Sequence, residues 1–230
     1  MSASGFLQQG GPVMYVLLGM SVLTVTIVVY KLIQFYRIGV GRSPFVNDVM
    51  ATIREGRDPA ALEMLEAYRS PVARVMESAI RVGADPTIPA GDAEAEISRV
   101  GSGQIRDMES FLRGLSAISH LAPFLGLLGT VMGMIEAFMN LQSAGSRVDP
   151  AQLSGGIWEA LLTTAFGLAI AIPAMALYFY FEGQVDRVRA AMKDASVQVL
   201  VHFRKARRSD EMSGTLEDPS RHIEGGEYGI

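Results

Sequence analysis

Three long apolar stretches constrain the fold of this chain more than any other feature of its sequence. They cover residues 12–31, 117–141 and 155–181, and charged side chains are almost absent from them. A helix of about 20 apolar residues is long enough to cross a lipid bilayer. No segment shows a convincing alternation typical of a strand. We therefore predict an all-α membrane protein with three transmembrane helices and long cytoplasmic helical extensions.

The basic residues set the expected orientation. Of the 20 Lys and Arg residues, none precedes Pro12, eleven lie between Lys31 and His120, one is Arg147, and eight follow Phe181. Because basic residues gather on the cytoplasmic side, the N-terminus is expected outside and the C-terminus inside. Bases follow rather than precede the first stretch, so we interpret it as an uncleaved span and not as a signal peptide.

These assignments divide the whole chain into segments. The expected order is an external N-terminus 1–11, transmembrane helix 12–31, cytoplasmic helical region 32–116, transmembrane helix 117–141, external loop 142–154, transmembrane helix 155–181, cytoplasmic helix 182–208 and disordered tail 209–230. Two helix starts are expected in the cytoplasmic region, at Asp58-Pro59 and Ser70-Pro71. A long helix beginning near Asp92 is expected to continue without a break into the second span, with a bend at Pro123.

The second and third spans are unusually rich in small residues. Each set falls on one side of its helix at about 100° per residue, and such stripes let helices in lipid approach closely. The small residues are Gly126, Gly129, Thr130, Gly133 and Ala137 in one span and Gly156, Ala160, Thr163, Thr164, Gly167, Ala171 and Ala174 in the other. Glu159 lies at the edge of the second stripe, and an ionisable group in such a place indicates a functional site.

Two motifs in these spans resemble a known family. Residues 121–135 read LAPFLGLLGTVMGMI, and residues 156–174 read GIWEALLTTAFGLAIAIPA. This pattern resembles the core of the MotA/TolQ/ExbB proton-channel family, and is most similar to its ExbB members, with TolQ next. The resemblance covers about 60 residues closely; the remainder of the chain agrees in layout rather than in motif.

The resemblance implies an assembly and a set of partners. It implies a homopentameric ring around a dimer of a single-span, ExbD-like partner that carries an essential membrane aspartate. The complex would lie in the inner membrane of a bacterium and use the proton motive force to energise a TonB-like protein that spans the periplasm. A TolQ-like role in envelope integrity, a flagellar stator subunit and a non-conducting membrane scaffold are the alternatives. Stator subunits usually have four spans and a longer cytoplasmic region, which disfavours that alternative.

The resemblance also assigns residues to the ion pathway. Thr130 and Thr164 match the two threonines that face the partner's aspartate, and Glu159 matches a glutamate at the mouth of the third span. A threonine bonded back to its own helix, or a carboxylate reaching for water, is the competing interpretation. Helix packing around the pathway is assigned to Gly126, Gly129, Gly133, Gly156, Thr163, Gly167 and Pro173, with a kink expected at Pro173.

The composition disfavours several other classes of protein. The chain has no cysteine, and its three histidines do not have the spacing of metal ligands. The net charge of −4 lacks the surplus of positive charge that is typical of nucleic-acid-binding proteins. No phosphate-binding loop or nucleophile elbow is present. We therefore expect no enzymatic activity, no cofactor, no metal and no nucleic-acid partner.

Glu136 departs from the residues that the resemblance to the family leads us to expect at this position. We expect it to serve an interface.

Overall fold

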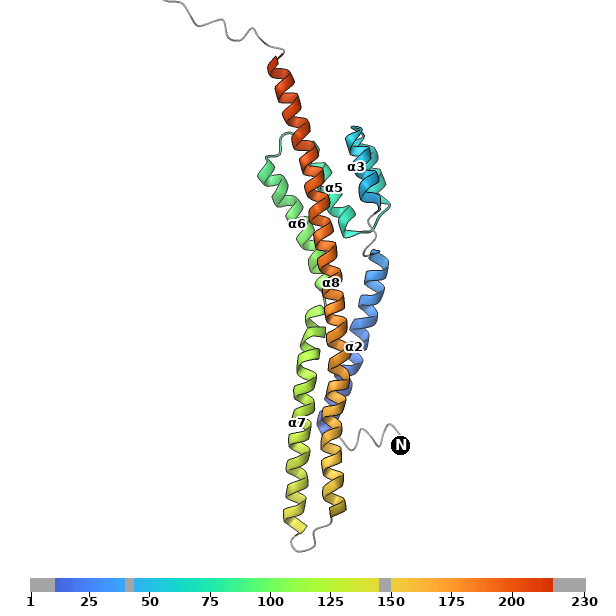
Figure 1. Ribbon diagram of the computed structural model, residues 1–230, viewed down its shortest axis with the longest axis vertical. Helices are drawn as coiled ribbons and strands as arrows, with labels where there is room; N and C mark the ends of the chain where they lie inside the picture. The colour runs from blue at the N-terminus through green and yellow to red at the C-terminus, as the bar shows by residue number, and fades with distance from the viewer. Residues whose placement is uncertain (1–10, 40–43, 145–149, 217–230) are drawn as a thin grey trace, which may run out of the picture. The chain divides into compact units, whose positions relative to one another are not determined.

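The computed structural model describes residues 11–39, 44–144 and 150–216. Most of the expected external N-terminus, the middle of the expected external loop and residues 217–230 lie outside this part of the chain. The described residues form helices, with no strand among them. In chain order (Figure 1) the helices are α2 (Gly11–Ile38), α3 (Phe45–Arg54), α4 (Asp58–Glu66), α5 (Pro71–Ala84), α6 (Ala90–Glu109), α7 (Leu112–Ala144) and α8 (Pro150–Leu216).

The chain divides into two compact units. The first, here called the membrane unit, comprises Met1–Tyr36 and Glu109–Val185. The second, here called the polar unit, comprises Arg37–Met108 and Asp186–Ile230. Helix α8 contributes to both of them, because it runs from Pro150 to Leu216.

In the membrane unit, each predicted span lies within one helix. Residues 12–31 belong to α2, residues 117–141 to α7 and residues 155–181 to α8. Three helices of the described chain are long and apolar enough to cross a membrane. Because many large apolar side chains of these helices are exposed, among them Val22, Leu127 and Leu161, lipid or neighbouring subunits must cover them.

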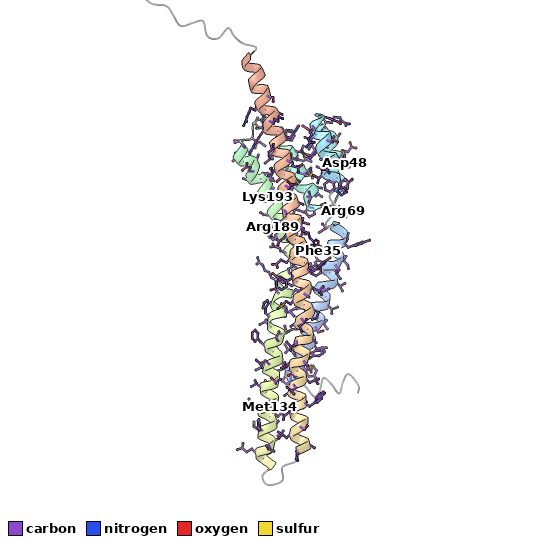
Figure 2. All side chains as sticks on the ribbon, in the orientation of Figure 1. Phe35, Asp48, Arg69, Met134, Arg189 and Lys193 are labelled. Carbon is purple, nitrogen blue, oxygen red and sulfur yellow. The ribbon has the colours of Figure 1, made fainter. Side chains whose placement is uncertain are left out.

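One face of α2 is buried against the other helices of the membrane unit. Its buried residues recur at helical spacing and are Val13, Met14, Leu17, Thr24, Ile27, Lys31 and Phe35. Ile27 lies against Gly114 of α7, where an added Cβ would come 3.6 Å from the Ile27 side chain. Phe35, labelled in Figure 2, stacks on Phe181 of α8 with ring centroids 5.4 Å apart. Helix α2 is therefore packed against both α7 and α8.

The predicted unbroken helix into the second span is wrong. Helix α6 ends at Glu109 and α7 begins at Leu112. Phe111 between them has φ 62°, a left-handed conformation that is unfavourable for a residue with a Cβ. A helix cannot continue through such a residue, and the sequence carries no Gly or Pro there to signal the break. Pro123 lies inside α7, which continues past it.

The polar unit is built from short amphipathic helices packed on the end of α8. Ser70 caps α5, because its hydroxyl accepts a hydrogen bond from the Val72 N–H at 3.3 Å, as predicted. Asp58, expected as the N-cap of α4, is instead the first helical residue, and Arg57 occupies the cap position. An apolar stripe at helical spacing on this part of α8 is buried at Val188, Met192, Ala195 and Val199.

The last turns of α8 hold the loop between α5 and α6. Arg207 donates hydrogen bonds to the carbonyl oxygens of Gly83 and Asp85 at 2.8 and 2.7 Å. The Thr87 hydroxyl and backbone N–H donate to the Asp85 carboxylate, and with nearby Arg207 these bonds lower the pKa of Asp85. Helix α8 then continues to Leu216, so the tail expected to be disordered from residue 209 begins as helix.

Candidate functional site at a glycine seam

The small-residue stripes of α7 and α8 face each other within one subunit. The two helices are joined by a short connection and lie side by side in the membrane unit (Figure 1). We call their contact the glycine seam and define it by Gly126, Gly129 and Gly133 of α7 and Gly156 and Gly167 of α8. At each of these five glycines an added Cβ would meet an atom of the other helix at 3.0 Å or less.

At Gly126 and Gly167 the main chains of the two helices are in direct contact. A Cβ on Gly167 would lie 2.6 Å from the Ala122 carbonyl oxygen and 3.1 Å from Gly126 Cα. A Cβ on Gly126 would lie 3.0 Å from both the Thr163 carbonyl oxygen and Thr164 Cα. Because these neighbours are main-chain atoms, they cannot move aside independently of the helix. Glycine is therefore required at both positions for the observed approach of the two helices.

Toward the other end of the seam, small side chains occupy the space that each glycine leaves. A Cβ on Gly133 would lie 2.9 Å from Ala160 Cβ, and one on Gly156 would lie 2.8 Å from Ala137 Cβ. Both alanines are buried. In a bilayer, where lipid is as apolar as the helices, such close packing is a main source of helix association.

Thr163 is the buried polar residue of the seam. Its side chain is 2% exposed. Its hydroxyl lies 2.7 Å from the Ala160 carbonyl oxygen of its own helix and 3.2 Å from the Gly126 carbonyl oxygen of α7. Thr163 thus contacts α7, and its assignment to helix packing around the ion pathway stays a prediction.

Thr130 and Thr164, the predicted pathway threonines, differ from Thr163. The Thr130 hydroxyl donates to the Leu127 carbonyl oxygen of its own helix at 2.7 Å. The Thr164 hydroxyl oxygen is buried and has no hydrogen-bond partner among the described residues. A buried hydroxyl without a partner costs about 1–3 kcal/mol. Thr164 therefore has an unused hydrogen-bonding capacity inside the subunit.

Two carboxylates lie toward the ends of α7 and α8 that the short loop connects. Glu159 is half-buried and Glu136 is exposed. They are close enough to act on each other electrostatically. Pro173 lies inside α8, which continues through it, and its side chain is exposed rather than part of the seam. The pathway role of Glu159 and the kink at Pro173 stay predictions.

Lys31 is a polar residue of the membrane unit that the sequence analysis treated only as the end of a span. The structure buries it completely, with 0% of it exposed. Its ammonium group donates to Gln34 Oε1 at 2.8 Å and lies 5.9 and 5.8 Å from the ring centres of Tyr30 and Phe35. The signal was available, because Lys31 continues the helical spacing of Thr24 and Ile27 on the buried face of α2.

The described residues include no group of three or more His, Asp or Glu side chains placed to hold a metal ion. What the membrane unit offers instead is a packed pair of helices that carries hydroxyl groups along a close contact. Hydroxyls can both donate and accept hydrogen bonds, so they can line a path for ions or water. The fold and this arrangement define the class: a membrane protein of three helical spans with a polar extramembrane unit.

The family is shown by comparison with known proteins. The model of the MotA/TolQ/ExbB proton channel family matches residues 67–194, which include the glycine seam and the polar stretches on either side of it. This chain belongs to the MotA/TolQ/ExbB proton channel family. The resemblance predicted from the two motifs is thereby confirmed.

Several biopolymer transport proteins named ExbB are similar to this chain. The Neisseria meningitidis serogroup B protein is 30% identical over 190 residues, covering 74% of this chain and 83% of the relative. The Pseudomonas putida protein is 38% identical over 105 residues, covering 46% of this chain and 32% of the relative. An ExbB homolog of Methanothermobacter thermautotrophicus is 31% identical over 180 residues, covering 78% of this chain but only 62% of the relative. The similarity is thus strongest to ExbB proteins.

Proposed function

We propose that this chain is the channel and motor subunit of an inner-membrane complex. With a single-span, ExbD-like partner it uses the proton motive force to energise a TonB-like protein for transport across the outer membrane. Membership of a proton channel family and similarity to ExbB proteins support this proposal. The positive-inside distribution of basic residues supports a periplasmic N-terminus and a cytoplasmic C-terminus.

The proposal depends mainly on one observation, the unsatisfied hydrogen-bonding state of the Thr164 hydroxyl. It is buried on α8, and the described part of the chain offers it no hydrogen-bond partner. A carboxyl group of a partner helix satisfies it once a movement of the helices uncovers the oxygen, because a carboxyl can accept a hydrogen bond and, when protonated, donate one. The chain contributes threonines to such a pathway, and the proton-carrying acid comes from the partner.

The proposed mechanism uses the threonines of this chain and the acid of the partner. The partner's membrane acid takes up a proton from outside, passes Thr130 and Thr164 in its neutral form, and releases the proton inside. The hydroxyls replace part of the hydration that the acid loses in the membrane. Moving one charge across 100 mV supplies roughly 2.3 kcal/mol, so several protons can drive one mechanical step.

We propose that the assembly is a homopentameric ring. The outward faces of α2, α7 and α8 carry large exposed apolar residues, among them Val22, Val131 and Ile172. One subunit leaves these faces uncovered, and a ring would cover part of them with sister copies and leave the rest to lipid. A ring also gives the partner helices a protein-lined space to turn in.

Substitution of Thr164 tests this function. In a complex purified with its single-span partner and reconstituted in vesicles, T164V is expected to assemble and to reduce potential-driven proton flux by roughly 2- to 10-fold. That range corresponds to losing a hydrogen bond between neutral groups, about 0.5–1.5 kcal/mol. T164S, which keeps the hydroxyl, should retain most of the flux.

Thr26 provides the matched control. It is an exposed threonine of α2 whose hydroxyl bonds back to the Val22 carbonyl oxygen at 2.8 Å. T26V should conduct like the unchanged complex, because that hydroxyl is already satisfied within its own helix. Full flux through assembled T164V would overturn the pathway role. Undiminished energising of outer-membrane transport by T164V in cells would favour the membrane scaffold instead.

A further inference from the structure

Two adjacent threonines of α8 have opposite hydrogen-bonding states. The Thr163 hydroxyl reaches two carbonyl oxygens, one on each helix of the seam. The Thr164 hydroxyl is buried and reaches none in the described part of the chain. Successive residues of a helix point about 100° apart, so the direction in which Thr163 is held fixes the direction of Thr164.

The fit of Thr163 against α7 is specific to one glycine. A Cβ on Gly129 would lie 2.5 Å from Thr163 Oγ1, 2.7 Å from Thr163 Cβ and 3.1 Å from Thr163 Cγ2. The Thr163 side chain therefore fills the space that a side chain at position 129 would need. Rotation of α8 in either direction would withdraw Thr163 from this space and open a gap in the seam.

The hydrogen bonds of Thr163 also constrain the direction in which its hydroxyl points. Both acceptors, the Ala160 and Gly126 carbonyl oxygens, are reached from one oxygen at 2.7 and 3.2 Å. A methyl group cannot occupy a position 2.7 Å from a carbonyl oxygen without a clash, since hydrogen bonding alone allows so short an approach. An isosteric valine must therefore change its rotamer or move α8.

We propose that Thr163 is a positioning residue that sets the rotation of α8 about its axis and so keeps the Thr164 hydroxyl buried and without a hydrogen-bond partner in the described part of the subunit. It acts through Thr164 and does not itself contact the transported ion. This inference rests on the proposed function for its consequence, but the geometry on which it depends concerns only this chain.

The chain's lack of cysteine makes a direct test possible. Its sequence contains none, so T164C introduces a single thiol into the full-length protein. The rate at which a small methanethiosulfonate reagent modifies this thiol reports how position 164 is presented. The rate is measured in T164C alone and together with T163S or T163V, after size-exclusion chromatography has shown that each variant assembles.

The expected outcomes separate the hydroxyl from the volume of the side chain. T163S keeps the hydroxyl and should leave the rate unchanged. T163V keeps the volume and should alter the rate by at least about threefold, which corresponds to the ~0.6 kcal/mol of an average interhelical hydrogen bond in a membrane. An unchanged rate in assembled T163V would overturn the proposal. This readout needs neither partner nor flux, so its failure is distinct from a failure of the proposed function.

A paired exchange of side chains gives a second, independent test. G129A places a methyl group where Thr163 lies and should alter the T164C rate. Adding T163G removes all three obstructing atoms, Oγ1, Cβ and Cγ2, and should restore the rate toward its original value. Independent, additive effects of G129A and T163G on the rate would show that the two positions are not coupled, and would contradict the proposal.

Discussion

At the scale of single residues, the seam depends on glycines whose neighbours are main-chain atoms. Gly167 is the most constrained, because an added Cβ would lie 2.6 Å from the Ala122 carbonyl oxygen. Gly155 and Gly183 belong to the same helix and have no atom within 4 Å of an added Cβ. These glycines therefore separate the effect of close packing from the effect of helix propensity.

G167A is expected to destabilise the protein by about 1–3 kcal/mol, the usual cost of overpacking. G183A is expected to be neutral or to stabilise by up to about 1 kcal/mol, because alanine favours a helix more than glycine does. Thermal unfolding of the detergent-solubilised protein measures both. Equal midpoints for G167A and G183A would show that the two helices are not in the close contact described here.

At the scale of helices, the break between α6 and α7 is held by Phe111 rather than by a helix-breaking residue. Its ring is exposed and meets Tyr30 edge-on, with centroids 5.4 Å apart and planes at 76°. An aromatic pair contributes about 0.5–1.5 kcal/mol, a range that overlaps the roughly 1–2 kcal/mol cost of a left-handed residue. The contact thus offsets much of the backbone strain.

Two substitutions at position 111 measure the energetic cost of its left-handed backbone conformation separately from the ring contact. F111N and F111V both remove the ring contact, but asparagine tolerates the left-handed region and a β-branched valine does not. F111N should therefore be more stable than F111V by about 1 kcal/mol or more. Denaturation midpoints of the two variants, compared under one condition, measure the difference. Greater stability of F111V would mean that the helix continues through position 111.

The end of α8 makes a second prediction at this scale. Arg207 donates to the carbonyl oxygens of Gly83 and Asp85, whereas neighbouring Arg208 is exposed. R207A should increase hydrogen exchange across the loop after α5, because charge-assisted bonds of about 1.5–3 kcal/mol are lost. R208A should leave that exchange unchanged. Similar exchange in both variants would show that Arg207 does not hold the loop.

The sequence predicted the three spans and the seam glycines, because apolar length and small-residue spacing are local signals. It did not predict the break at Phe111, since that position depends on a contact with Tyr30 far away in the sequence. It also missed the burial of Lys31, although this residue ends the first predicted span and continues the helical spacing of Thr24 and Ile27 on the buried face of α2. The different hydrogen-bonding of Thr163 and Thr164 depends on helix rotation, which spacing alone does not fix.

At the scale of the whole molecule, the proposed function requires a channel subunit that is incomplete without a partner. The seam closes α7 and α8 against each other, so the pathway cannot run between them within a subunit. Thr164 keeps a buried hydroxyl without a partner in the described chain, and Thr130 bonds to its own helix. The unpartnered Thr164 hydroxyl fits the proposal that an acid from another chain completes the conduction path, whereas the Thr130 bond is the one expected of a threonine that does not line it.

Proton flux with and without that other chain tests this claim most directly. Vesicles containing this protein alone, and vesicles containing it purified together with its single-span partner, are compared under an imposed membrane potential with a pH-sensitive dye inside. The account predicts no flux above empty vesicles for the protein alone and clear flux for the complex. Sustained proton flux through the protein alone would contradict it.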